Sequence, residues 1–148
     1  MYKMLLQKNM QKAIKLAQTS GFDLPIGCII VDTNNNIIAK STNEVEKNNN
    51  VACHAEMLAI EEACKNLNTK HLNGCKMFVT LEPCPMCAWN IILSRIDTVY
   101  FGAYDLNYGA FLSKYDLRKA ANSKLKVYGG ICEDDCASLI KNYFKNLR

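Results

Sequence analysis

Long apolar runs, arginines and linker-like segments are scarce or missing in this sequence. No apolar stretch approaches the roughly 20 residues that a transmembrane helix needs, and the first residues lack the apolar core and cleavage site of a signal peptide. No linker, repeat or change of composition divides the chain. These absences predict one cytoplasmic domain over residues 1–148, without a membrane segment.

The charged residues favour a polyanionic partner only weakly. The net charge is +4, and clustered lysines gain free energy by displacing counterions from phosphates. Arginine, however, occurs only at positions 95, 118 and 148. The abundance of lysine, asparagine and isoleucine is also what an adenine- and thymine-rich genome produces, so charge alone does not identify a nucleic-acid partner.

The eight cysteines are expected to be free or metal-bound thiols, because disulfides are rare in a reducing compartment. Cys28, Cys64 and Cys75 lie within apolar patterns, and Cys132 and Cys136 share one face of a predicted helix. We expect these five thiols in the core.

Hydrophobic periodicity predicts strands and helices that alternate along much of the chain. The predicted strands cover residues 26–31, 37–39, 76–81, 98–101 and 125–128. The predicted helices cover residues 6–17, about 54–63, about 85–93 and 132–147. Residues 32–36 are rich in Asp and Asn, which suits an antiparallel hairpin turn. Residues 42–50 and 104–114 are expected to be loops.

The most informative pattern is His54-Ala55-Glu56 followed by Pro83-Cys84-Pro85-Met86-Cys87, with each motif opening a predicted helix. A C-x-x-C pair at a helix start brings two sulfurs to one cation, and the helix dipole there favours the thiolates that a metal requires. His54 supplies a third ligand, which leaves a tetrahedral zinc ion one position for water. This order matches the established H-x-E and P-C-x-x-C signature of zinc nucleobase deaminases.

Glu56 lies two residues from the histidine ligand and is predicted to carry protons rather than to hold metal. Zinc lowers the pKa of a bound water to about 7, which makes hydroxide available to attack an amidine-like ring carbon. Glu56 takes the proton of the water, delivers it to the ring nitrogen and protonates the amine that departs as ammonia. The main alternative is a closed structural zinc site in a non-catalytic RNA-binding module, with Cys53 as a fourth ligand, and this leaves Glu56 without a role.

The chain resembles the bacterial tRNA-specific adenosine deaminases of the cytidine deaminase-like superfamily almost from end to end. The matching segments besides the zinc motifs are residues 25–31, Asn43, 79–83, 94–96 and 102–105. The resemblance implies a three-layer α/β/α fold with a central mixed five-stranded sheet, a homodimer and a Zn²⁺ cofactor. It also implies conversion of adenosine to inosine at the wobble position of a tRNA anticodon stem-loop. The alternative function is deamination of a free base or nucleotide, such as guanine or a cytosine derivative, since only the pocket would differ.

The resemblance also implies substrate contacts. Asn43 would hydrogen-bond the target purine with its paired donor and acceptor, although an asparagine there can also cap a loop. Asp105, in the Gly-Ala-x-Asp segment, is placed on the substrate side of the site. Tyr143 and Phe144, followed by basic residues that include Arg148, resemble the family's terminal helix that meets the anticodon loop. Aromatic rings there can stack on splayed bases, whereas Tyr143 can alternatively belong to the core.

Three departures from the family pattern affect these expectations. Trp89-Asn90 replaces two small residues on a helix that the family uses at its dimer contact. Phe111-Leu112 stands where the family's loop is small and contains glycine, and Cys53 stands where a threonine is common. The dimer geometry, the RNA-facing surface and the fourth-ligand question depend on these positions.

Overall fold

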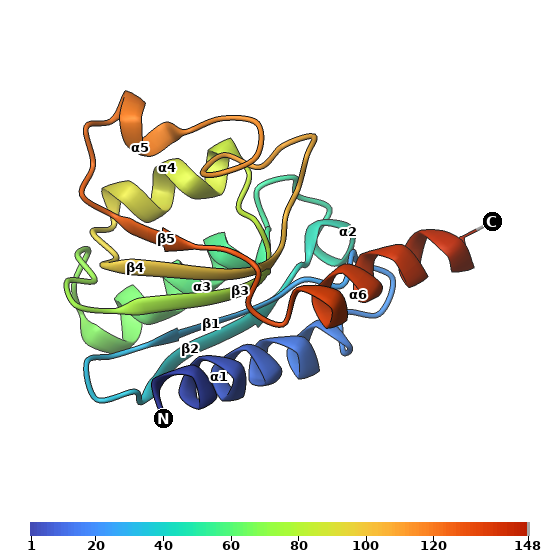
Figure 1. Ribbon diagram of the computed structural model, residues 1–148, viewed down its shortest axis with the longest axis horizontal. Helices are drawn as coiled ribbons and strands as arrows, with labels where there is room; N and C mark the ends of the chain where they lie inside the picture. The colour runs from blue at the N-terminus through green and yellow to red at the C-terminus, as the bar shows by residue number, and fades with distance from the viewer. Residues whose placement is uncertain (148) are drawn as a thin grey trace.

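The computed structural model describes residues 1–147, and a mixed five-stranded sheet forms its centre (Figure 1). The strands are β1 (Gly27–Val31), β2 (Ile37–Thr42), β3 (Lys76–Leu81), β4 (Thr98–Ala103) and β5 (Lys126–Tyr128). Their order across the sheet is β2-β1-β3-β4-β5. Strand β1 runs antiparallel to β2 and β3, whereas β3, β4 and β5 are parallel to one another.

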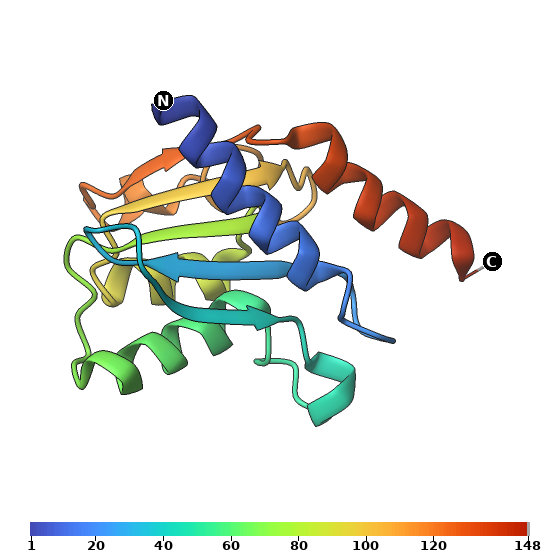
Figure 2. The same cartoon turned by 90° about the horizontal axis from the view of Figure 1, so that it is seen from below.

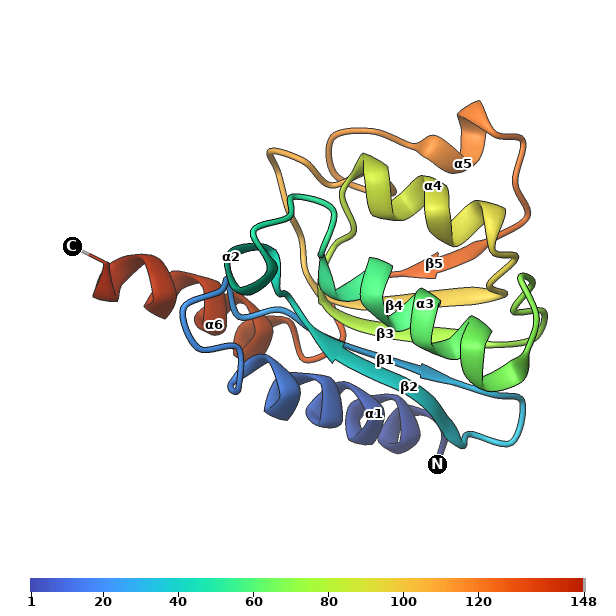
Figure 3. The same cartoon turned by 180° about the vertical axis from the view of Figure 1, so that it is seen from behind.

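Helices cover both faces of the sheet (Figures 2 and 3). One face carries α1 (Tyr2–Ala17) and α6 (Glu133–Asn146), and the other carries α3 (Ala55–Leu67) and α4 (Pro85–Leu93). The short helices α2 (Val45–Asn48) and α5 (Leu117–Ala120) lie in connections. The predicted α/β/α layering is confirmed. No helix within residues 1–147 is long and apolar enough to cross a membrane.

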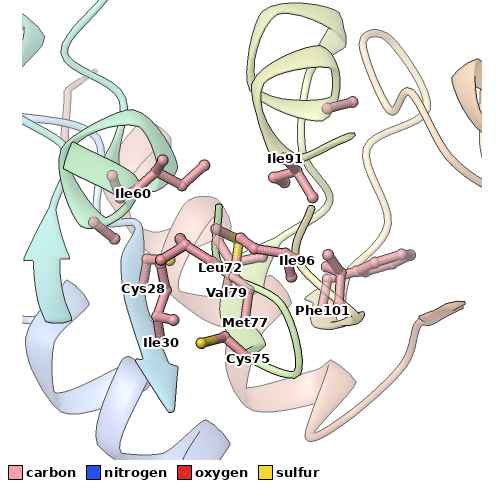
Figure 4. Packing of buried hydrophobic residues seen from close by; sticks show 14 of the residues in the cluster. Cys28, Ile30, Ile60, Leu72, Cys75, Met77, Val79, Ile91, Ile96 and Phe101 are labelled. Carbon is pink, nitrogen blue, oxygen red and sulfur yellow. The ribbon is translucent and has the colours of Figure 1, made fainter. Parts of the chain in front are cut away.

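The sheet is buried on both faces because its central strands are apolar on both. In β1, Cys28 and Ile30 belong to the core under α3 and α4, where Ile60 and Ile91 face the strands (Figure 4). The intervening Ile29 belongs to the second core, under α1 and α6. A continuous apolar run is typical of a strand that is covered on both sides.

The predicted hairpin between the first two strands is confirmed. The Asp32 carboxylate accepts hydrogen bonds from the N–H groups of Asn34 and Asn36, both at 2.9 Å. Asn35 adopts a φ of 64°, a left-handed conformation that asparagine tolerates better than most residues. Side-chain chemistry within five residues therefore determines this turn.

The structure differs from the sequence prediction mainly at element ends and in loops. Residues 42–50, predicted as a loop, contain α2, whose N–H groups at Glu46 and Lys47 donate to the Asp23 carboxylate at 2.7 and 3.1 Å. This capping group comes from a distant segment, so local periodicity does not reveal it. Helix α5 was also not predicted, and α1 begins earlier, at Tyr2.

One edge of the sheet collects the ends of four strands. The start of β1 pairs with the end of β2, Cys28 pairs with Val79 near the end of β3, and Leu81 pairs with Ala103 at the end of β4. The chain enters α4 directly after β3 at this edge. Functional side chains from several segments can therefore meet there.

Candidate metal centre and pocket

His54 and Cys84 are the residues that precede the first turns of α3 and α4. Pro85 occupies the first turn of α4, and proline restricts the residue before it to extended backbone, as the Cys84 angles of −76° and 172° show. Cys87 follows in the first turn and is buried. The positive end of the helix dipole stabilises thiolates at this place.

The side chains of His54, Cys84 and Cys87 converge. Nδ1 of His54 lies 3.6 Å from Sγ of Cys84 and 3.5 Å from Sγ of Cys87, and the three ligand atoms all lie within 4.8 Å of one another. In a tetrahedral zinc site with bonds of about 2.1 and 2.3 Å, a nitrogen and a sulfur ligand are about 3.6 Å apart. One nitrogen and two sulfur donors at this spacing fit a zinc ion.

Hydrogen bonds within this cluster shift the pKa values of its members. The pKa of Cys84 is lowered to about 4, first by its hydrogen bond with Cys87 and then by one with His54. Burial of the thiol acts in the opposite direction. The bond between the two cysteines and burial raise the pKa of Cys87. The pKa of His54 is raised, first by its hydrogen bond with Cys84. The Cys84 sulfur therefore holds negative charge at neutral pH, and thiolate is the form of cysteine that binds metals.

Glu56 lies beside the cluster in the first turn of α3, and 4% of the residue is exposed. Its Oε1 has no hydrogen-bond partner among residues 1–147. Burial raises the pKa of the Glu56 carboxyl to about 7. A carboxyl group with a pKa near neutrality can both accept and release a proton at physiological pH.

A pocket of about 410 Å³ lies beside the metal cluster, and it is lined by His54, Cys84 and Glu56 but not by the fully buried Cys87. It is lined by Leu24, Ile26, His54, Glu56, Leu81, Glu82, Cys84, Pro85, Met86, Asp105 and Tyr108. Largely apolar walls with a few polar groups are typical of sites for small organic groups. A larger groove of about 950 Å³ lies between α1 and the start of α6. Its lining includes lysines of α1 and acidic residues of α6, and none of the zinc-motif residues.

Cys53 precedes His54 but does not join the cluster of ligands found among residues 1–147. Its Sγ accepts a hydrogen bond from Nδ2 of Asn48, at 3.6 Å, and so faces α2. The fourth-thiol alternative therefore finds no support in this geometry.

Comparison with known proteins identifies the family. Residues 4–103 match the family model of the cytidine and deoxycytidylate deaminase zinc-binding region. A tRNA-specific adenosine deaminase of Rickettsia bellii is 42% identical over 144 residues, which cover 94% of this chain and 99% of that protein. This chain belongs to the tRNA-specific adenosine deaminase family.

Solved structures agree with this family assignment. A structure from a study of A-to-I editing by tRNA:A34 deaminases at the wobble position of transfer RNA is 34% identical, with a TM-score of 0.85, and the match covers 89% of this chain and 98% of that one. Guanine deaminase from Bacillus subtilis is 31% identical, with a TM-score of 0.64 and coverage of 79% and 70%. The cytidine deaminase-like fold, the deaminase class and the zinc cofactor predicted from the sequence are confirmed by these family matches.

Two of the predicted substrate residues, Asn43 and Asp105, lie at the edge of the sheet that borders the pocket. Asp105 lines the pocket, and its Oδ1 accepts hydrogen bonds from the N–H groups of Asn107 and Tyr108 at 3.0 and 3.1 Å. Asn43 directly follows β2 and is buried, and its N–H donates to the carbonyl of Ile26 at 3.2 Å. Asn43 Oδ1 has no hydrogen-bond partner among the described residues, so a ligand could supply one.

The other two predicted substrate residues lie on α6, which extends beyond the sheet (Figure 1). The Tyr143 hydroxyl donates to the carbonyl of Phe22 at 3.0 Å, and the Phe144 side chain is exposed. Within residues 1–147 the pocket lining includes neither ring. Arg148 lies outside the described residues. Contact of this helix with an anticodon loop stays a prediction.

Sequence reasoning missed Glu82, Met86 and Tyr108 as pocket residues. Glu82 carried a signal, because a lone acid between an apolar strand and Pro83 falls where the chain is expected to be buried. Tyr108 carried none beyond its place in an aromatic-rich loop.

Proposed function

We propose that this protein deaminates adenosine to inosine at the wobble position of a tRNA anticodon. The observation that carries the proposal is the convergence of His54, Cys84 and Cys87 beside a pocket that His54, Cys84 and the buried Glu56 carboxyl line. The substrate follows from the relatives, which are tRNA-specific adenosine deaminases at about 40% identity over nearly the whole chain.

In this proposal His54 Nδ1 and the Sγ atoms of Cys84 and Cys87 would hold the zinc ion. When bound there, zinc supplies Lewis acidity, which makes water a nucleophile at neutral pH. The apolar pocket walls limit access of bulk water and strengthen electrostatic interactions inside.

Glu56 moves the protons of the reaction. Its carboxylate accepts a proton from the attacking water and delivers it to the ring nitrogen next to the reacting carbon. The carboxylate then takes the second proton of that water, from the hydroxyl now on the ring carbon, and passes it to the exocyclic amine, which leaves as ammonia as its bond to the carbon breaks. One water is consumed for each ammonia released, and Glu56 returns to its initial state. The pKa of about 7 keeps both forms of this carboxyl accessible.

The remaining predicted residues would bind the RNA. We place the target base in the pocket. Asn43 is not among the lining residues but is bonded to one of them, Ile26, and we propose that its Oδ1 accepts a hydrogen bond from the base. Asp105 would contact the substrate from the pocket wall. Tyr143 and Phe144 would meet the anticodon loop beyond the pocket, where Phe144 has an exposed ring for stacking.

We further propose a homodimer of one-domain chains that acts in the cytoplasm, where tRNA is available. Support for the dimer comes from α4, which exposes Met86, Trp89 and Leu93 along one side. A symmetric partner over this helix would remove these apolar side chains from water. Light scattering at micromolar concentration tests this, and a monomer would contradict it.

The decisive experiment is an inosine assay on an anticodon stem-loop with adenosine as the first anticodon nucleotide, run beside free guanine, adenosine and cytidine. We expect inosine in the stem-loop and little turnover of the free compounds. The guanine arm is included because a guanine deaminase shares the fold at 31% identity. Turnover of guanine or cytidine with an inert stem-loop would refute the proposed substrate.

A further inference from the structure

A buried carboxylate outside the metal cluster holds the loop that forms one wall of the pocket. Glu82 lies between β3 and α4, and 2% of the residue is exposed. Its Oε1 accepts a hydrogen bond from the N–H of Asp105 at 3.2 Å, and its Oε2 accepts from the N–H groups of Phe111, Leu112 and Ser113 at 3.3, 2.7 and 3.0 Å. The Ser113 hydroxyl adds a bond to Oε1. One side chain thus satisfies five donors of the loop at residues 104–113.

The backbone of this loop approaches the carboxylate so closely that a side chain would not fit between them. A Cβ at Gly109 would collide with Glu82 Oε1 and lie 2.5 Å from the carbonyl oxygen of Asp105. The next residue, Ala110, donates its N–H to the carbonyl of Pro83 at 2.9 Å. The loop is therefore attached to the segment just before Cys84 by both side-chain and backbone bonds.

The attached loop carries two of the pocket residues. Asp105 and Tyr108 line the pocket, and the Asp105 carboxylate bonds to the Tyr108 N–H, which fixes one relative to the other. The Tyr108 ring is exposed, so it stands where the pocket opens to solvent. A polynucleotide has to pass this wall to place one base inside, and an exposed aromatic ring can stack on a neighbouring base.

We propose that Glu82 is a positioning residue for substrate binding, which holds the loop at 104–113 and thereby Asp105 and Tyr108 in the geometry that receives the RNA. This rests on the proposed function. A carboxylate suits the task because its two oxygens only accept, and all five partners donate. A glutamine there would turn an N–H₂ group toward N–H donors and leave some of them unsatisfied.

The test compares Glu82→Gln with the parent enzyme in zinc content, amide hydrogen exchange and steady-state kinetics on the stem-loop. We expect about one zinc per chain, and exchange at residues 105 and 111–113 faster by about tenfold or more because the loop opens locally. We expect KM to rise about tenfold or more with kcat within about threefold, because the loop binds substrate and does not touch the reacting bond. Glu62→Gln, the same change at an exposed position of α3, should behave as the parent.

Two variants that keep the carboxylate guard against a folding defect in Glu82→Gln. Gly109→Ala should reproduce the split between KM and kcat, because its methyl group pushes the loop away from Glu82. Ser113→Ala removes one donor of the five and should give a smaller rise in KM. Parent-like KM in both Glu82→Gln and Gly109→Ala would overturn the proposal, and so would a loss of zinc in parallel with kcat.

The outcome is distinguishable from failure of the proposed function. If the parent leaves the stem-loop unchanged, the substrate assignment fails, whereas exchange at residues 111–113 still reports whether Glu82 holds the loop. If the parent is active and the loop opens without a change in KM, only the positioning role fails.

Discussion

Replacing Glu56 by glutamine should stabilise the protein at pH 8 once the metal has been removed with a chelator. The Glu56 carboxyl is buried, its Oε1 has no partner among residues 1–147, and burial raises its pKa to about 7 from an ordinary value of 4.5. Ionisation of this buried carboxyl therefore destabilises the folded protein. A neutral amide of similar shape does not have this effect.

The sign and size of the effect follow from proton linkage. Between pH 4.5 and about 7 the folded protein holds a proton on Glu56 that the unfolded chain has lost, so the free energy of unfolding falls as pH rises. Each pH unit in this window costs about 1.4 kcal/mol, which amounts to about 3 kcal/mol above pH 7. Below pH 4.5 both states are protonated and the cost vanishes.

Denaturant unfolding of chelated parent, Glu56→Gln and Glu62→Gln measures this, with a reductant present to keep the eight cysteines reduced. We expect Glu56→Gln to exceed the parent by about 3 kcal/mol at pH 8 and to approach it near pH 4.5. Glu62→Gln makes the same change from carboxyl to amide at an exposed position of α3, and so measures the effect of the substitution without burial. A difference between Glu56→Gln and the parent that does not change with pH would refute the role assigned to burial.

Three other predictions concern the metal site and the RNA. Glu56→Ala should keep about one zinc per chain and lose about 10² to 10⁴ in single-turnover rate, whereas His54→Ala should lose zinc and activity together; an active, zinc-loaded Glu56→Ala enzyme would exclude the proton-transfer role. Cys53→Ser should retain the zinc that Cys84→Ser loses, as judged by native mass spectrometry, and equal losses would restore the four-ligand structural site. Binding of the stem-loop should weaken steeply as salt rises from about 50 to 200 mM, since each neutralised phosphate releases counterions; salt-insensitive binding in a filter assay would argue against phosphate contacts.

Local patterns in the sequence were sufficient for the elements whose causes are local. The hairpin at 32–36 was predictable because Asp32 binds N–H groups two and four residues ahead. The start of α4 was predictable because proline suits the first turn of a helix, where its missing N–H is not needed, and disrupts a helix interior. The spacing of Cys84 and Cys87 on that first turn already implied convergence of their sulfurs. The short apolar runs at 26–31, 76–81 and 98–101 likewise predicted strands where β1, β3 and β4 lie.

Contacts between distant segments were decided only by the tertiary structure. The sequence left open whether Cys53 is a fourth ligand beside His54, Cys84 and Cys87, and the fold turns Cys53 toward Asn48 instead. It did not reveal that Asp23 caps α2 or that Glu82 binds the loop at 104–113. Periodicity and turn chemistry report on residues within about one helical turn or a few strand positions of each other. Which donors a buried carboxylate meets depends on which segments the sheet brings to its edge, and that follows from the packing of the whole chain.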